Sequence, residues 1–197
     1  TARACAEGIR RANPRARCGI NISCYNENAL RIADLVYREG HSFYYCGVDQ
    51  YFGSWQPGDV DNWTGVIDSL YERYRLPVLA NEWGYSSAGE LAAQKPDPKE
   101  IPFGFPDVCY VKKWFYEVSG GHTPQVQADY FDRGLKLFAE HPHCLGSFMF
   151  CWRDACHCYH CGEPDCPAEC YWGLVTADCE PKPAYYAVKT ALETYYK

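Results

Sequence analysis

The sequence predicts an α/β fold built on a parallel sheet, because strand-like and helix-like segments alternate along most of the chain. The expected strands are short apolar runs, and the expected helices repeat apolar residues at helical spacing. A first helix is followed by four strand-helix units. The 197 residues are 47% hydrophobic and 22% charged, which is enough apolar material for one core and argues against disorder.

Turn and breaker residues set the boundaries of these elements. Asn13-Pro14 closes the first helix and Gly40 stops the second. The expected elements, in chain order, are a helix at 4–14, a strand at 16–23, a helix at 28–40, a strand at 43–52, a helix at 60–74, a strand at 76–81, a helix at 123–141, a strand at 144–152 and a helix at 183–197.

Two long connections interrupt this alternation. Residues 86–122 are rich in proline and glycine and are too long for an ordinary connection, so we expect an inserted loop or lid. Residues 153–180 form a second, cysteine-rich excursion after the fourth strand.

Four parallel strand-helix units fit either a small doubly wound sheet or half of an eight-stranded barrel. The doubly wound fold calls for a glycine-rich phosphate loop after an early strand, and the sequence has none. A TIM (β/α)8 barrel calls for polar and aromatic residues where its strands end, and it needs about 250 residues. We therefore expect residues 1–197 to form a single partial TIM-barrel domain. The polar and aromatic strand-end residues are Asn21, Ser23, Tyr25 and Asn26, then Asp49, Gln50, Tyr51 and Trp55, then Asn81, Glu82 and Trp83, then Trp152, Arg153 and Asp154.

Charge and hydropathy exclude some partners. The net charge is −6 with basic residues scattered along the chain, which disfavours nucleic acid and anionic membranes as partners. No apolar run approaches the ~18 residues that span a bilayer. Thr1 opens the chain with no leader pattern, so we expect the sequence to be a piece of a longer chain.

Four runs of sequence carry a family resemblance: GVDQYFGSW, LPVLANEWG, GSFMFCWRD and WGLVTADCEPKPAYYAVK. Together they resemble the second half of a clan A glycoside hydrolase, the (β/α)8 retaining glycosidases that include β-galactosidases, β-glucuronidases, β-glucosidases and glycanases. The resemblance covers nearly the whole chain and implies the C-terminal half of the barrel, about strands 5 to 8. It implies that Glu82 is the nucleophile, that Tyr51 hydrogen-bonds it, and that Trp152 floors the sugar pocket.

The resemblance also implies a retaining, double-displacement reaction on β-linked carbohydrate, with no cofactor for catalysis. Such a reaction needs a second carboxyl group as acid and then base. In the family that group follows strand 4, which would lie before Thr1. Two alternatives stay open: Glu82 is itself the strand 4 acid/base, or Glu27 of the Asn26-Glu27 pair supplies the acid. We expect the N-terminal half of the barrel, or a second copy, as partner. The alternative function is a catalytically incomplete carbohydrate-binding or barrel-assembly module.

Residues at the strand ends are the candidates for sugar contact. Aromatic rings stack on pyranose faces and side-chain amides hydrogen-bond sugar hydroxyls, although Gln50 and Asn21 could equally satisfy loop backbone. Arg153 and Asp154 either bind substrate or pair with each other. The expected substrate-binding residues are Asn21, Gln50, Trp55, Asn81, Trp83 and Trp152.

The thirteen cysteines include a dense group in the stretch CHCYHCGEPDCPAEC. Isolated cysteines in apolar context and one crowded group favour a reducing compartment, so the expected location is cytoplasmic. The group offers more soft ligands than a tetrahedral zinc site needs, and such a site would fold the loop rather than catalyse hydrolysis. Disulfides and free thiols are the alternatives. Four zinc ligands are expected from among Cys156, Cys158, Cys161, Cys166 and Cys170.

Overall fold

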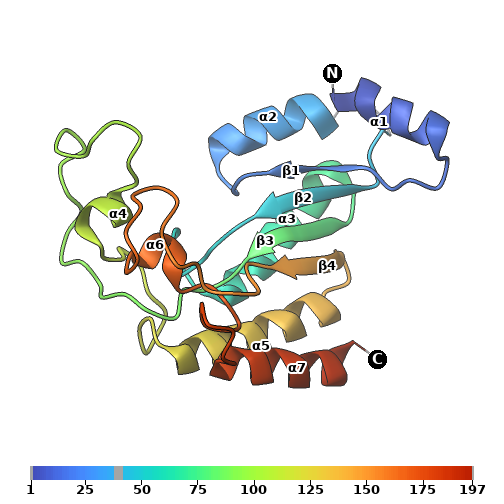
Figure 1. Cartoon of the computed structure of the whole chain (residues 1–197). Helices are drawn as coiled ribbons and strands as arrows, with labels where there is room; N and C mark the ends of the chain where they lie inside the picture. The colour runs from blue at the N-terminus through green and yellow to red at the C-terminus, as the bar shows by residue number, and fades with distance from the viewer. Residues whose placement is uncertain (1, 38–41, 197) are drawn as a thin grey trace. The chain divides into compact units, whose positions relative to one another are not determined.

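The computed structural model describes residues 2–37 and 42–196 and has an α/β fold with one four-stranded sheet (Figure 1). Each strand lies beside its neighbour in the sequence, and β1–β2 and β2–β3 pair in parallel. The strands are β1 (Gly19–Ile22), β2 (Tyr45–Asp49), β3 (Val78–Trp83) and β4 (Cys144–Met149).

The helices confirm the predicted alternation. All nine predicted elements are present, whereas the short helices α4 and α6 were not predicted. The predicted stop at Gly40 lies outside the described residues. None of the described helices is long and apolar enough to cross a membrane. The helices are α1 (Ala2–Ala12), α2 (Glu27–Tyr37), α3 (Trp63–Tyr74, after a 3-10 turn at Val60–Asn62), α4 (Asp107–Val111), α5 (Pro124–Glu140), α6 (Pro167–Cys170) and α7 (Pro183–Tyr195).

The chain divides into two compact units, and the single domain expected from the sequence stays a prediction. The first unit carries β1 to β3 and most of β4, and the second carries the two long connections. The first unit consists of the described residues of Thr1–Gln50, Trp63–Trp83 and Phe138–Phe148, and the second of those of Tyr51–Asn62, Gly84–Leu137 and Met149–Lys197.

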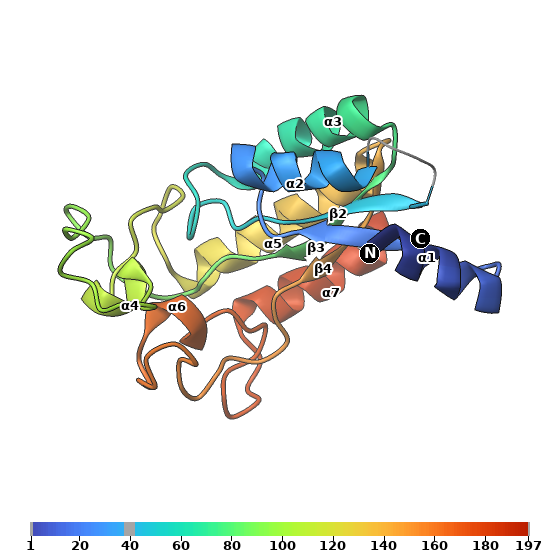
Figure 2. The same ribbon diagram turned by 90° about the horizontal axis from the view of Figure 1, so that it is seen from above.

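In the first unit, α2 and α3 lie on the same side of the sheet (Figure 2). The strand residues that face this side are small or β-branched and fully buried: Cys46, Val48, Val78 and Ala80. Burying such residues against helices is the main favourable term that holds the two layers together. Because side chains alternate along a strand, the residues between them, up to Asp49 at the end of β2, point to the opposite face.

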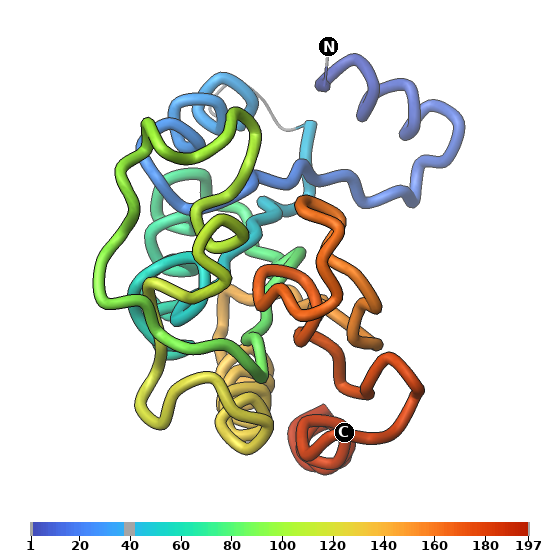
Figure 3. The backbone as a smooth tube through the Cα atoms, turned by 60° about the vertical axis from the view of Figure 1, so that its left-hand side comes forward, coloured from blue at the N-terminus to red at the C-terminus, as the bar shows by residue number. Residues whose placement is uncertain are grey.

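In the second unit, α5 and α7 run side by side (Figures 1 and 3). The hydroxyl group of Tyr196, just after α7, donates a hydrogen bond to the main-chain oxygen of Leu135 in α5 at 3.2 Å. The connection expected at 86–122 contains α4, and the one expected at 153–180 contains α6. These two short helices pack against each other around a core that includes Trp114 and Trp172.

Candidate functional site

The register between β2 and β3 brings two carboxyl groups together at the ends of these strands. Val48 pairs with Ala80, but the next residue, Asp49, pairs with Glu82. Asn81 is therefore one extra residue in β3, as in a β-bulge, which re-aims the side chains that follow it. As a result the side chain of Glu82 is exposed beside Asp49, and that of Trp83 points to the buried side.

Asp49 is held in place by one hydrogen bond. The side-chain amide of Asn21, on β1, donates to Asp49 Oδ2 at 2.6 Å. Asp49 Oδ1 is buried and has no hydrogen-bond partner within the described residues. Burial raises the pKa of this carboxyl group to about 6, the hydrogen bond from Asn21 opposes that rise, and the nearby charge of Glu82 adds to it. Asp49 thus carries a proton in much of the protein at mildly acidic pH.

Glu82 lies where its side chain is open to solvent and its backbone is fixed. Its main-chain oxygen accepts a hydrogen bond from the Gln50 N–H at 3.0 Å, which continues the ladder by one residue beyond β2. Its role as nucleophile stays a prediction, and the geometry that a nucleophile requires, an exposed carboxylate on a rigid strand end, is present.

Asn81 lies across Gly47 on the central strand. A Cβ atom at position 47 would come within 2.6 Å of Asn81 Nδ2, so only glycine fits here without a shift of that amide. Asn81 and Asn21 are thus on the same open face as Glu82, where the sequence predicts substrate contact. Both roles remain predictions.

The Trp83 ring is not exposed, as a ring that stacks on a sugar must be. Its exposed fraction is 0%, and its ring packs edge-to-face on Phe138 with the centroids 4.8 Å apart. The expectation that Trp83 contacts substrate is therefore corrected. The extra residue at Asn81 changes the alternation of β3 and sends this ring into the core.

The Gln50 side chain is also buried and stabilises the fold. Its exposed fraction is 3%, and its side-chain oxygen accepts a hydrogen bond from the Tyr25 N–H at 3.0 Å. Of the two interpretations of Gln50 made from the sequence, the structure favours the one in which it satisfies loop backbone. Its function is to fix the loop that follows β1.

The remaining predicted aromatic residues belong to the second unit. The Tyr51 ring is half-buried against Trp172 at 5.1 Å, and the Trp55 ring is half-buried against Trp114 at 5.3 Å. Trp152 is 62% exposed, so its ring is open to a ligand. The expected hydrogen bond between Tyr51 and the nucleophile stays a prediction.

Asp154 pairs with Lys182 and not with its sequence neighbour. The Lys182 ammonium lies 3.0 Å from Asp154 Oδ1, both side chains are buried, and the same oxygen accepts the Gly173 N–H at 2.7 Å. Burial lowers the pKa of Lys182, and the hydrogen bond and charge of Asp154 oppose that effect. The pair ties the start of α7 to the segment after β4, so we assign it to the fold and not to substrate binding.

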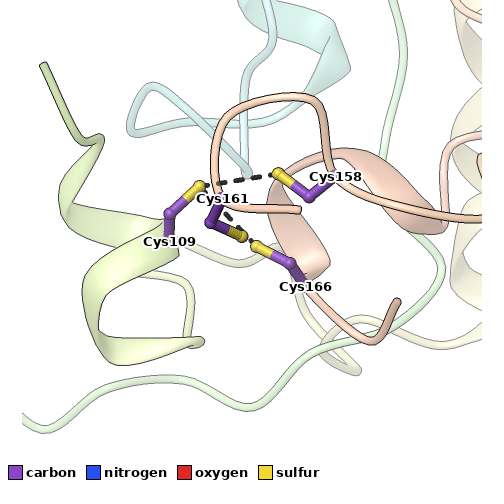
Figure 4. A group of neighbouring side chains, drawn as sticks. All are labelled: Cys109, Cys158, Cys161 and Cys166. Atoms are coloured by element: carbon purple, nitrogen blue, oxygen red, sulfur yellow. Dashed lines mark hydrogen bonds between the residues drawn. The ribbon is translucent and has the colours of Figure 1, made fainter. Parts of the chain in front are cut away.

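A cluster of four thiols forms a second candidate site, within the second unit (Figure 4). The sulfur atoms of Cys109, Cys158, Cys161 and Cys166 all lie within 4.8 Å of one another, and we call these residues the thiol cluster. The set expected from the sequence is corrected in two ways. Cys109, on α4, joins it, whereas the exposed Cys156 and the buried Cys170 are outside it.

Sequence spacing gave no signal for Cys109, because it lies 49 residues before Cys158 and only the packing of α4 on α6 brings it near. Burial raises the pKa of Cys109, and raises that of Cys166 to about 12. Desolvation acts in the same direction on Cys161, but hydrogen bonds from the Glu163 backbone and from neighbouring thiols outweigh it, so the pKa of Cys161 is lowered.

No family model matches the chain, and no curated protein matches it. Solved structures do match. A Faecalibacterium prausnitzii β-glucuronidase superposes with a TM-score of 0.59 at 17% identity, over 97% of this chain and 28% of that one. A GH2 β-galacturonidase from Eisenbergiella tayi, bound to galacturonate, gives 0.59 at 14% identity, over 98% and 30%. Bacteroides uniformis β-glucuronidase 2, covalently bound to cyclophellitol-6-carboxylate aziridine, gives 0.62 at 14% identity, over 98% and 20%.

These similarities extend over almost the whole of this chain but over less than a third of each matched protein. At such low identity they concern the fold and not the chemistry. The chain therefore has the fold of one part of these glycoside hydrolases.

Proposed function

We propose that this chain carries the nucleophile half of a retaining glycoside hydrolase site that acts on β-linked carbohydrate, with Glu82 as the nucleophile. The observation that carries the proposal is the position of Glu82. It is an exposed carboxylate at the carboxyl end of a strand in a parallel sheet, next to a second carboxyl group and two side-chain amides. Active sites of parallel α/β proteins form at this end of the strands.

The proposed architecture is the C-terminal half, strands 5 to 8, of a TIM barrel. Two findings support it. The strands β1 to β4 follow one another in the sheet in chain order, as successive strands of a barrel do. The fold similarity also covers almost the whole of this chain and less than a third of each of several larger glycoside hydrolases.

Asp49 is the second carboxyl group that the ladder places beside Glu82. Neighbouring strands lie about 4.8 Å apart, so the two groups lie side by side on one face of the sheet. A retaining reaction needs an acid/base group that flanks the glycosidic bond opposite the nucleophile. We therefore assign Asp49 to positioning and charge control of Glu82. In this proposal the acid/base comes from a segment outside this chain that completes the sheet.

Covalent labelling tests this assignment. A 2-deoxy-2-fluoro glycoside with a dinitrophenolate leaving group needs little help from an acid, so it suits a site that holds only the nucleophile. The panel should contain glucuronosyl, galacturonosyl, galactosyl and glucosyl reagents. We expect an adduct on Glu82, detected by intact mass and located by peptide mapping, and the reacting member of the panel identifies the sugar.

Two variants serve as controls for the labelling. Glu82→Gln removes the nucleophile and should abolish the adduct. Glu27→Gln changes the carboxylate of the other Asn-Glu pair, at the start of α2, and should leave the labelling unchanged. An adduct on Glu27, or no adduct from any reagent on folded protein, would contradict the proposal.

A carbohydrate-binding or assembly module is the second candidate function, and the edges of the sheet favour it. Among the described residues, β1 and β4 each have one strand neighbour, and unpaired strand edges are sites of association. The proposed partner is the N-terminal half of the barrel or a second copy of the chain. Analytical ultracentrifugation tests the second possibility, since a homodimer shows twice the mass. The proposed location is a reducing compartment, the cytoplasm, on the sequence argument that several cysteines stand singly in apolar context and others form one crowded group.

A further inference from the structure

Two sulfur–sulfur distances in the thiol cluster match those of a tetrahedral metal site, and all four sulfurs lie within 4.8 Å of one another. The sulfur of Cys109 lies 3.7 Å from that of Cys158 and 3.6 Å from that of Cys166. Four sulfurs at about 2.3 Å from a zinc ion would lie about 3.8 Å from one another. A disulfide bond requires a sulfur–sulfur distance of about 2.05 Å, and none of the four cysteines is disulfide-bonded.

The local backbone also suits a metal site. Cys158 and Cys161 have the Cys-x2-Cys spacing of structural zinc ligands. Gly162 follows with a φ of 78°, a left-handed conformation that glycine adopts without strain, and its N–H donates to the Cys158 main-chain oxygen at 2.7 Å. This tight turn directs both sulfurs to the same point.

The surroundings exclude water from most of the cluster. Cys109, Cys158 and Cys166 are buried, and the apolar residues around them include Val108 and Ala168. Four neighbouring thiols stabilise an apolar core less well than apolar side chains of similar volume, because each thiol adds a weak polar group to the core. A metal ion accounts for the gathering of four sulfurs, since each sulfur then becomes a ligand.

We propose that Cys109, Cys158, Cys161 and Cys166 bind one Zn²⁺ ion in a closed, structural site. On binding, the thiols lose their protons to solvent and the four thiolates complete a tetrahedral shell. The shell leaves no position for water or substrate, so the site has no catalytic role. Zinc and not an iron–sulfur cluster is assigned, because a cluster places its own iron and sulfide atoms between the four thiolates and so holds them further apart.

The site ties together two insertions that are far apart in the sequence. Cys109 comes from the connection after β3, and the other three ligands come from the connection after β4. Lys112 makes exposed ion pairs with Glu163 and Asp165 across the same junction, at 3.4 Å and 3.0 Å, and exposed pairs of this kind contribute little. Zinc therefore adds a direct bond between α4 and the cysteine-rich segment, beside the apolar packing that already joins α4 to α6.

Metal analysis of the purified full-length chain tests the proposal. We expect one zinc per chain by plasma mass spectrometry, and thiolate-to-metal charge-transfer absorption when cobalt replaces zinc. Cys109→Ser should weaken zinc binding by more than the 10- to 100-fold that is typical for loss of a group that merely hydrogen-bonds a ligand. Cys156→Ser and Cys170→Ser are matched controls from the same segment, and they should retain full zinc.

Thiol mapping on the unaltered protein keeps the test valid if Cys109→Ser does not fold. With zinc bound, iodoacetamide should spare the four cluster cysteines, and a chelator should make them reactive. Cys46 is equally buried but lies outside the cluster, so it should stay protected in both states.

Three results would overturn the proposal: a chain with no zinc, a chain that holds iron in its place, or zinc that survives Cys109→Ser and is lost in Cys156→Ser or Cys170→Ser. An intact mass lower by two hydrogens per bridge would show disulfides and would also overturn it.

Discussion

Replacing Asp49 with asparagine should change how stability depends on pH, because it removes a carboxyl group that is costly to ionise. Asparagine has nearly the same shape and can still accept the hydrogen bond from Asn21. The substitution therefore removes the charge and preserves the packing. The Asp49→Asn variant should be more stable than the wild type at neutral pH and similar to it near pH 4.

The size of the effect follows from the pKa of Asp49, which is raised from 3.8 to about 6. A shift of about two units corresponds to at most about 3 kcal/mol, and partial exposure of the group reduces this to about 1.5 kcal/mol. The folded state binds a proton more tightly than the unfolded state, so this stabilisation is present below about pH 4 and is lost as the pH rises through about 6. The asparagine side chain of the variant cannot ionise, so the variant lacks this loss.

Urea unfolding between pH 4 and pH 8 measures the effect as the difference in unfolding free energy between wild type and variant. Asp178→Asn, at a position on the surface, serves as the control substitution. Glu82→Gln should reduce the effect, since the charge of Glu82 contributes to the raised pKa. Curves for wild type and Asp49→Asn that run parallel across the whole range would refute the reasoning.

Four further substitutions test assignments made from the structure, each by urea unfolding. Trp83→Ala should cost about 3–5 kcal/mol of unfolding free energy as a large core truncation, whereas Trp152→Ala should change stability by less than about 0.5 kcal/mol and weaken carbohydrate binding measured by calorimetry. Lys182→Met should cost about 3–5 kcal/mol, because it leaves the buried Asp154 charge without its partner. Gly47→Ala should cost about 1–3 kcal/mol, since its Cβ would meet a neighbouring side-chain amide.

The order of strands and long helices could be predicted because each carries a periodic apolar pattern or a clear breaker. The short helices could not. α4 and α6 have five and four residues, too few for a period to be read or for a helix to be stable by itself. They are held by contacts between segments far apart in the sequence, and a single sequence contains no record of such contacts.

The candidate site, too, could be predicted from the sequence only in part. Glu82 could be found because an apolar strand ends at it, but the register of its strand could not. One extra residue at position 81 decides that Trp83 faces the core, that Glu82 faces solvent and that Asp49 is its neighbour. Cys109 was missed for the related reason that tertiary packing alone brings it to the thiol cluster.

The register at Asn81 has opposite consequences on the two faces of β3. On one face it buries a tryptophan and stabilises the fold, and on the other it places two carboxyl groups side by side at a cost in stability. If the pairing of β2 with β3 had been selected for stability alone, it would bury Trp83 without placing Asp49 and Glu82 side by side. Sites that trade stability for activity are expected to become more stable when their charged groups are neutralised. If Glu82 is the nucleophile, then Glu82→Gln should abolish covalent labelling and raise the unfolding free energy at neutral pH in the same protein. A destabilised Glu82→Gln variant would instead make this carboxylate part of the scaffold.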